Sequence, residues 1–230
     1  MFVADLIRPV LGDDDRHHLA RVLRLRPGEE VTGADGAGGW RRFRYCGGGE
    51  LEPVSAVDVA ARPAPRLTVA FALTKGERPE WTVQKLVEVG VDCIVPMISA
   101  RTVVQWGGEG GEKASRNSER LRTVARAAAM QSRRRWLPVV NDVQPFASVV
   151  AGVCGGAALA ALGGAAPSLT RPTILVGPEG GWDESELASG LPLVGLGPAV
   201  LRAETAAMAA GVLLSALRAG VVAGRLDDGS

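Results

Sequence analysis

The sequence predicts an α/β fold in two domains, a small β domain followed by a larger domain built on a parallel sheet. A proline-rich connector, RPAPR at 62–66, separates two halves of different character. Before the connector, short apolar runs alternate with glycine-rich turns, which is typical of β structure. After it, short apolar runs alternate with helical patterns, which is typical of a parallel sheet. We therefore expect domains at 1–64 and 65–230.

Composition narrows the protein class. The chain has 230 residues, of which 47% are hydrophobic, 22% charged and 4% aromatic, so it can bury a core and is neither disordered nor collagen-like. A net charge of +1 excludes a globally basic nucleic-acid coat but permits a local basic patch. Cys46, Cys93 and Cys154 show no CxxC spacing, which disfavours disulfides and structural zinc and favours a reducing cytoplasm. The start, MFVAD, lacks the pattern of a secretion signal.

The first domain opens with a predicted helix. Acidic residues at 13–15 suit a helix start, and Leu19, Val22 and Leu23 would form its apolar face. Pro27-Gly28 then turns the chain. Short strands are expected around Val31, at 40–45 and at 51–59. The pattern indicates a barrel-like β domain.

The second domain alternates strands and helices. Strands are predicted at 67–73, 91–97, 157–162, 173–176 and 193–196, and helices at 79–89, 113–134 and 204–219. Pro79 suits a first helical turn, and Gly220 suits a helix end. The uncharged stretch 145–170 is long enough to cross a bilayer, but it is rich in glycine and poor in large aliphatic residues. We interpret it as a helix followed by a buried strand, not as a membrane span.

Two glycine-rich loops carry the strongest functional signal. GPEGGW at 177–182 follows one predicted strand, and LGPAVLRAETA at 196–206 runs from the end of another. Ligands of α/β sheets bind beyond the carboxyl ends of strands, and glycine lets the backbone approach a flat ligand. Neither loop is GxGxxG or GxxxxGKS, which disfavours a nicotinamide cofactor and ATP. Taken singly, each loop could equally be an ordinary strand-to-helix turn.

Together the two loops resemble the SPOUT class of S-adenosylmethionine-dependent RNA methyltransferases, and within it the RsmE family. Further blocks agree along nearly the whole chain: HHLARVLRLRPG at 17–28, KGER at 75–78, residues 81–91, SARTV at 99–103 and QSRR at 131–134. The chain departs from the family at Ala127 and Met130, where an acid usually precedes the Gln-Ser pair. It also departs at Gly163-Gly164, where the family has a polar turn.

The resemblance implies an activity and a fold. The family methylates N3 of a uridine in 16S ribosomal RNA of the small subunit. It uses S-adenosyl-L-methionine, is dimeric, and holds the cofactor in a deep trefoil knot of the C-terminal domain. The N-terminal domain would resemble the PUA-like β-barrels that bind RNA. The cofactor-binding residues carried over to this chain are Leu162, Val176, Gly177, Glu179, Gly180, Leu196, Gly197, Leu201, Glu204, Thr205 and Ala206.

Arg202 and Glu179 are the predicted catalytic residues. A guanidinium can stabilise the negative charge that develops on the uracil carbonyl oxygens when N3 loses its proton. The alternative for Arg202 is a structural ion pair with Glu204 plus helix capping. Two roles stay open for Glu179, as a proton acceptor or as an anchor of its loop, so the sequence names no single general base.

Basic residues predict the RNA contacts. Between positions 113 and 135 there are eight basic residues and one acid, a local charge that suits phosphate contact, although a solvated helix face is the alternative. At 40–45, arginines alternate with aromatics, which suits phosphate contact with base stacking or simply a half-buried strand. The two histidines are too few for a metal site, and no metal is expected. The predicted RNA-binding residues are His17, Arg21, Arg24, Arg26, Arg41, Arg42, Lys75, Arg133 and Arg134.

Two other functions compete with this interpretation. One is a related knotted methyltransferase that acts on a ribose or a tRNA base. The other is a non-catalytic RNA-binding or ribosome assembly factor that uses the basic helix and the β domain.

Overall fold

The computed structural model describes residues 1–12, 16, 24–104, 106, 112–153 and 156–223. By their contacts the residues form two compact units. Unit 1 comprises Met1–Pro63 together with Met130–Leu137, and unit 2 comprises Ala64–Ala129 with Pro138–Ser230. The domain division at 64/65 stays a prediction. The helix expected to begin at 13–15 lies outside the described residues.

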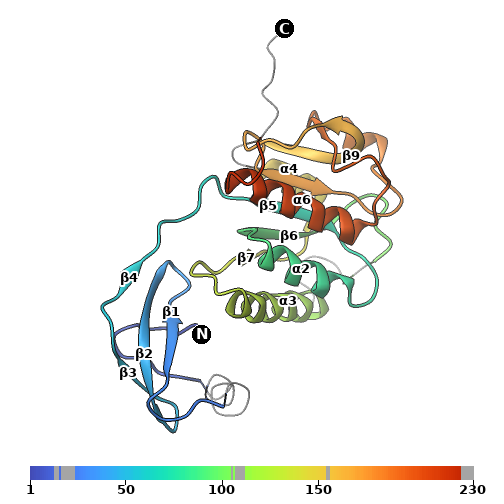
Figure 1. Cartoon of the computed structure of the whole chain (residues 1–230). Helices are drawn as coiled ribbons and strands as arrows, with labels where there is room; N and C mark the ends of the chain where they lie inside the picture. Colours follow the sequence, from blue (N-terminus) through green and yellow to red (C-terminus); the bar gives the residue numbers. More distant parts are fainter. Residues whose placement is uncertain (13–15, 17–23, 105, 107–111, 154–155, 224–230) are drawn as a thin grey trace. The chain divides into compact units, whose positions relative to one another are not determined.

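Unit 1 is built on a four-stranded antiparallel sheet. Its strands are β1 (Glu30–Ala34), β2 (Gly39–Gly47), β3 (Glu50–Pro53) and β4 (Asp58–Val59). The order is β1-β2-β3, and β4 pairs with the beginning of β2 (Figure 1). The strand predicted at 51–59 is thus two short strands, because the chain leaves β2 after Pro53 and returns to it at Asp58.

Among the described residues, the buried core cluster of unit 1 is small and consists of Val3, Leu6, Leu11, Phe43 and Tyr45. Phe43 and Tyr45 alternate along β2 with exposed Arg42 and Arg44, as expected for a strand with one buried face. Both aromatic rings are therefore buried in the core, and base stacking by these two rings is excluded.

A segment from far along the chain completes unit 1. Trp136 forms a bridge with Ala37 and its indole Nε1 donates to the carbonyl of Ala60 at 3.1 Å. The amide of Leu137 donates to the carbonyl of Gly36 at 2.9 Å. Gly38 has a φ of 100°, and a Cβ there would lie 2.6 Å from the Trp136 ring. Residues 130–137 therefore belong with the β sheet, although the sequence pattern assigns most of them to a helix.

Unit 2 contains the predicted parallel sheet, with seven strands in the order β11-β9-β10-β5-β6-β7 and β8 paired to β6. The strands are β5 (Thr68–Ala72), β6 (Cys93–Ile98), β7 (Val139–Val140), β8 (Gln144–Pro145), β9 (Ala157–Ala165), β10 (Thr173–Val176) and β11 (Leu193–Val194). The helices are α2 (Arg78–Glu88), α3 (Glu112–Gln131), α4 (Phe146–Ala151), α5 (Glu184–Leu187) and α6 (Ala203–Arg218).

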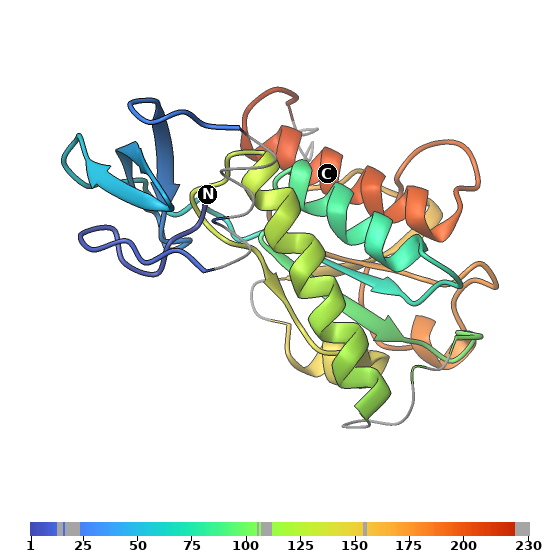
Figure 2. The same cartoon turned by 90° about the horizontal axis from the view of Figure 1, so that it is seen from below.

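Helices cover the sheet of unit 2. Figures 1 and 2 show α2 between α3 and α6 on one face. There α6 packs against β5 and α2, and Gly211 allows this approach because a Cβ would lie 2.9 Å from Leu86 and 3.0 Å from Val91. On the other face, Val149 of α4 packs with Ala70 and its neighbours. Side chains of a strand point alternately to the two faces, so both faces of β5 are buried.

Most predicted elements are confirmed within a few residues. The expected strand 173–176 coincides with β10, and the uncharged stretch supplies α4 and β9. Three short elements were not anticipated: β7, β8 and α5. Among the described residues, none of the helices combines the length and apolarity needed to span a membrane. The trefoil knot stays a prediction.

Candidate functional site

A cavity of about 440 Å³ lies in unit 2 beside the middle of β9, the end of β10 and the chain around β11. Gly177 of the first glycine loop and Gly197 of the second both line it, so the expected meeting of the two loops is confirmed. The volume is within the range of small-molecule sites. The lining residues are Ala160, Ala161, Leu162, Val176, Gly177, Pro178, Glu179, Gly181, Trp182, Leu187, Leu193, Leu196, Gly197, Ala199, Val200, Leu201, Ala203 and Ala206.

Trp182 fixes the first loop against the sheet. Its indole Nε1 donates to the carbonyl of Ala160 in β9 at 2.9 Å, and its ring packs on Phe146 with centroids 5.6 Å apart. A Cβ at Gly177 would lie 3.0 Å from the Trp182 ring, so glycine lets the ring fold back under the loop. The loop that follows β10 is therefore held by packing as well as by a hydrogen bond.

Polar contacts hold the far end of the same loop. Arg101 donates to the carbonyl of Gly180 at 3.1 Å and pairs with Asp183 at 3.5 Å. Asp183 caps α5 and forms a capping box with Glu186. The buried carboxylate of Glu186 accepts from the amides of Ala100 and Asp183, both at 2.9 Å. These contacts join the loop to the chain that follows β6.

The hydroxyl and amide of Ser185 donate to the Asp183 carboxylate, and these hydrogen bonds hold the pKa of Asp183 below its ordinary value. Asp183 therefore keeps its charge to a lower pH than an ordinary aspartate, and it caps the helix in its stronger, anionic form.

A close backbone approach joins β9 to the chain around β11, next to the cavity-lining residues Leu193 and Leu196. A Cβ at Gly164 would lie 2.5 Å from the carbonyl carbon of Val194, and a Cβ at Gly195 would lie 2.7 Å from the carbonyl oxygen of Gly164. The amide of Gly195 donates to the carbonyl of Ala165 at 2.8 Å. Glycine is therefore required at both positions by sterics, and the departure from the family pattern at Gly163-Gly164 falls on this contact.

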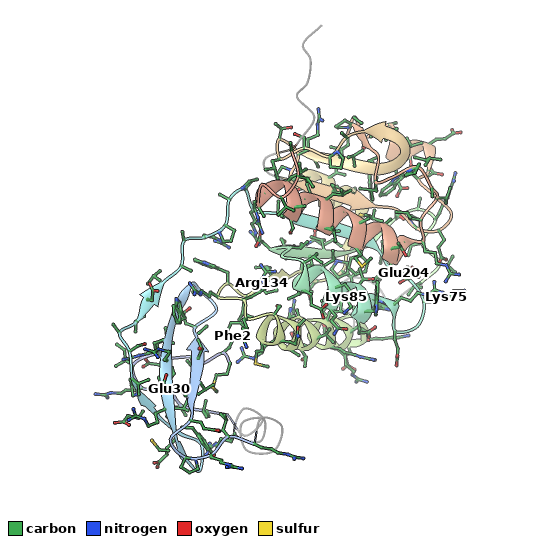
Figure 3. The ribbon with its side chains drawn as sticks, viewed as in Figure 1. Phe2, Glu30, Lys75, Lys85, Arg134 and Glu204 are labelled. Atoms are coloured by element: carbon green, nitrogen blue, oxygen red, sulfur yellow. The ribbon has the colours of Figure 1, made fainter. Side chains whose placement is uncertain are left out.

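Arg78, at the beginning of α2, connects the two loops. Its guanidinium lies 2.7 Å from Glu179 in the first loop and 3.6 Å from Glu204 in the first turn of α6. The Glu204 side chain is 12% exposed, and its Oε2 is buried without a hydrogen-bond partner among the described residues. Figure 3 shows Glu204 at the beginning of α6 and Lys75 in the loop after β5.

Arg202 is the exposed residue that precedes α6, and the described residues pair Glu204 with Arg78 rather than with Arg202. The alternative of an Arg202–Glu204 ion pair is therefore wrong. Arg202 does not line the cavity, although its neighbours Leu201 and Ala203 do.

Most of the predicted cofactor residues meet in the cavity. Those that line it are Leu162, Val176, Gly177, Glu179, Leu196, Gly197, Leu201 and Ala206. Gly180, Glu204 and Thr205 lie beside lining residues without lining it themselves. Sequence reasoning missed Arg78 as a link between loops, and missed the small residues Ala160 and Ala161. For Arg78 a signal existed, because it belongs to the KGER block, but no pattern connects it with two distant carboxylates.

The predicted RNA-binding residues of unit 1 differ in their surroundings. Arg41 donates to the carbonyls of Leu6 and Ser55, each at 3.0 Å, and Arg42 pairs with Glu30 at 3.0 Å. Arg24, Arg26 and Arg133 are exposed, and Arg134 is half-buried. His17 and Arg21 lie outside the described residues.

In unit 2, Lys75 is exposed, and two arginines of the basic helix have carboxylate partners. Arg120 pairs with Glu80 at 3.1 Å and Arg122 with Asp142 at 2.9 Å. Part of the basic cluster therefore serves helix packing.

Comparison with known proteins gives the family. The family described as an RNA methyltransferase domain matches residues 62–215, and the one described as an RNA methyltransferase PUA domain matches residues 11–45. A relative named Ribosomal RNA small subunit methyltransferase E from Mycobacterium tuberculosis is 36% identical, over 90% of this chain and 87% of its own. One with the same name from Bacillus subtilis is 30% identical, over 84% of each chain.

Solved structures agree with the sequence comparison. Ribosomal RNA small subunit methyltransferase E from Neisseria gonorrhoeae, bound to S-adenosyl methionine, has a TM-score of 0.77 at 28% identity and covers 94% of this chain and 96% of its own. A methyltransferase from Legionella pneumophila with bound cofactor has a TM-score of 0.79 at 25% identity, with the same coverage. With a PUA-like unit, a parallel α/β unit and two loops meeting in one cavity, the chain belongs to the ribosomal RNA small subunit methyltransferase E (RsmE) family of RNA methyltransferases.

Proposed function

We propose that this protein transfers a methyl group from S-adenosyl-L-methionine to N3 of a uridine in 16S ribosomal RNA of the small subunit. The observation that carries the proposal is the meeting of both glycine loops in one cavity, in a chain of this family. The related structure from Neisseria gonorrhoeae binds S-adenosyl methionine. We also propose that the protein is located in the reducing cytoplasm and that it forms a homodimer.

The cavity fits such a cofactor. Its walls are mainly aliphatic and backbone, which suits an adenine ring and the methylene groups of the methionine part, and Glu179 adds one carboxylate. The buried Oε2 of Glu204 beside it is a hydrogen-bond acceptor still without a partner among the described residues. Gly177, Leu196 and Leu201 would contribute backbone groups. When bound, the cofactor supplies an electrophilic sulfonium methyl group.

The protein's remaining tasks are to align the base and to stabilise its anion. Uridine N3 is a poor nucleophile until it loses its proton. Arg202 is exposed between two residues that line the cavity, where its guanidinium would stabilise charge on the uracil oxygens. The ion pair between Glu179 and Arg78 favours the role of Glu179 as a loop anchor over that of a proton acceptor.

Calorimetry with S-adenosylhomocysteine tests the cofactor site. Wild type is expected to bind, and absence of heat at millimolar ligand would contradict the proposal.

Arg202→Ala is expected to keep cofactor binding and to lose about 10²–10³-fold in the rate of methyl transfer, as for removal of an oxyanion-stabilising group. Arg171→Ala, an exposed arginine outside the cavity, is the matched control and should keep both.

Two measurements separate the competing functions. Mass mapping of methylated nucleosides distinguishes uridine N3 from a ribose or a tRNA base. A non-catalytic assembly factor would bind RNA in a salt-sensitive way that ignores S-adenosylhomocysteine and would produce no methylated nucleoside.

A further inference from the structure

The carboxylate of Glu204 has an unusual environment for an acidic residue. It lies in the first turn of α6, is only 12% exposed, and has one oxygen buried without a partner among the described residues. A buried charge of this kind is costly unless an opposite charge stands near it. Among the described residues, the cation paired with it is Arg78, at 3.6 Å.

The same guanidinium makes a second contact. Its NH1 lies 2.7 Å from Glu179, which lines the cavity, whereas Glu204 follows the lining residue Ala203 and stands two residues before the lining residue Ala206. One side chain on α2 thus contacts both segments, each of which supplies residues that line the cavity. An exposed ion pair such as Arg78–Glu179 is weak by itself, so the main contribution comes from compensation of Glu204.

We propose that Arg78 is a positioning residue of the cofactor site, holding the loop 177–182 and the first turn of α6 at the spacing that the ligand requires. Arg78 does not line the cavity and so would act through the two glutamates. The identity of the ligand rests on the proposed function, whereas the positioning of the two segments does not.

Arg78→Met tests the proposal, because methionine keeps much of the aliphatic stem and is a good helix former. Arg44→Met is the matched control: Arg44 forms an ion pair of similar exposure with Glu52, 48% and 58% against 42% and 61% for Arg78 and Glu179. Hydrogen exchange in the ligand-free protein is read at two amides whose hydrogen bonds close the segments, Gly181 to Pro178 and Ala206 to Arg202.

In Arg78→Met, the rate of hydrogen exchange at both amides is expected to rise by about 5- to 30-fold. The affinity for S-adenosylhomocysteine is expected to fall by the same factor, which corresponds to a loss of about one or two kcal/mol. In a transfer assay the KM for the cofactor should rise while kcat changes little, because ligand binding is affected and not the chemistry. Arg44→Met should change neither the exchange nor the affinity. Arg78→Lys should keep more of the affinity than Arg78→Met, because lysine retains the positive charge. The affinity should still be below that of wild type, because an ammonium group lacks the planar fork that holds two carboxylates.

The double variant Arg78→Met with Glu204→Gln tests whether Arg78 acts on the cofactor site through Glu204. If Arg78 acts through Glu204, its replacement should cost less affinity in the Glu204→Gln background than in wild type. Unchanged exchange and affinity in Arg78→Met, with wild type binding normally, would overturn the proposal. If wild type itself fails to bind S-adenosylhomocysteine, the proposed function fails, and the exchange measurement still decides whether Arg78 positions the segments.

Discussion

The two units use arginine in different ways. In unit 1, guanidinium groups lie over aromatic rings: Arg135 is 4.2 Å from the centroid of Trp40, and Arg62 is 5.1 Å from that of Trp136. In unit 2, arginines bind carboxylates and carbonyl oxygens at loops and helix ends. Arg218, for example, pairs with the partly buried Asp92 and donates to the carbonyl of Gly90 at 2.8 Å. The small unit thus adds cation–π contacts to the carbonyl and carboxylate contacts that Arg41 and Arg42 make there, whereas the larger unit uses arginine at loops and helix ends.

The hydrophobic cores of the two units also differ. In the part of unit 1 that the structure describes, the core cluster has five buried residues, and a segment from elsewhere in the chain completes the unit. Unit 2 buries both faces of its central parallel strands. A small core contributes little to the free energy of unfolding, so we expect unit 1 to unfold at a lower denaturant concentration than unit 2.

The largest expected effect tests this difference directly. Phe43 is fully buried in unit 1, and Phe43→Ala should cost about 3–5 kcal/mol, enough to unfold that unit while unit 2 stays folded. The control is Leu214→Ala in unit 2, also fully buried, with a cost of about 2–5 kcal/mol that unit 2 should survive. Urea unfolding monitored by circular dichroism gives both. A single transition shared by the whole chain in both variants would remove the distinction between units.

The second prediction concerns the segment 130–137. Trp136 is half-buried and donates to Ala60, so Trp136→Ala should cost about 2–4 kcal/mol, somewhat less than for a fully buried ring. The loss should appear in unit 1, with S-adenosylhomocysteine binding by unit 2 retained. Trp81→Ala, an exposed tryptophan, is the control and should leave stability nearly unchanged. If Trp136→Ala left unit 1 as stable as wild type, the segment would not be part of it.

The third prediction moves to unit 2. Gly164→Ala would place a Cβ against the backbone of Val194, and overpacking of this kind costs about 1–3 kcal/mol. Because the displaced backbone lies between the cavity-lining residues Leu193 and Leu196, ligand binding should weaken as well. Gly12→Ala in unit 1 is the control, since a Cβ there would meet nothing within 4 Å. Normal binding by Gly164→Ala would show that the cavity tolerates the shift.

The smallest effect is a pH dependence. Asp183 in unit 2 and Asp5 in unit 1 both have a pKa below the ordinary 3.8, the first chiefly through Ser185 and the second through the amides of Ile7 and Arg8. A lowered pKa in the folded state stabilises that state above pH 3.8, and the contribution is lost as the pH falls through the lowered value.

Ser185→Ala should bring the pKa of Asp183 back toward 3.8 and leave the pKa of Asp5 unchanged. Carboxyl titration by NMR measures both groups in one experiment. Equal shifts of the two would contradict their assignment to separate local causes.

Local patterns predicted much of the fold. The strand 173–176 follows from a short apolar run between proline and glycine, and the end of α6 follows from Gly220. The meeting of the two glycine loops also followed, because the carboxyl ends of parallel strands share one edge of a sheet.

Long-range contacts were beyond the sequence pattern. The predicted helical pattern continues to 134, but the contacts of residues 130–137 with Gly36, Gly38 and Ala60 assign this segment to unit 1. Likewise, Glu204 has a neighbouring arginine in sequence, Arg202, but its partner is Arg78, more than a hundred residues away. Ion pairs of this kind depend on which elements pack together, and no local spacing encodes that.

Residues 130–137 belong to unit 1 but are synthesised long after the rest of it, which has a consequence for folding on the ribosome. When Met1–Pro63 have left the ribosome, the sheet of unit 1 still lacks Trp136 and Leu137. At synthesis rates of about 5–20 residues per second, the missing piece follows roughly 4–15 s later. During that interval the nascent β sheet exposes the surface around Gly38 that the tryptophan later covers. Co-translational folding of this end of the protein is therefore expected to wait until α3 has been made.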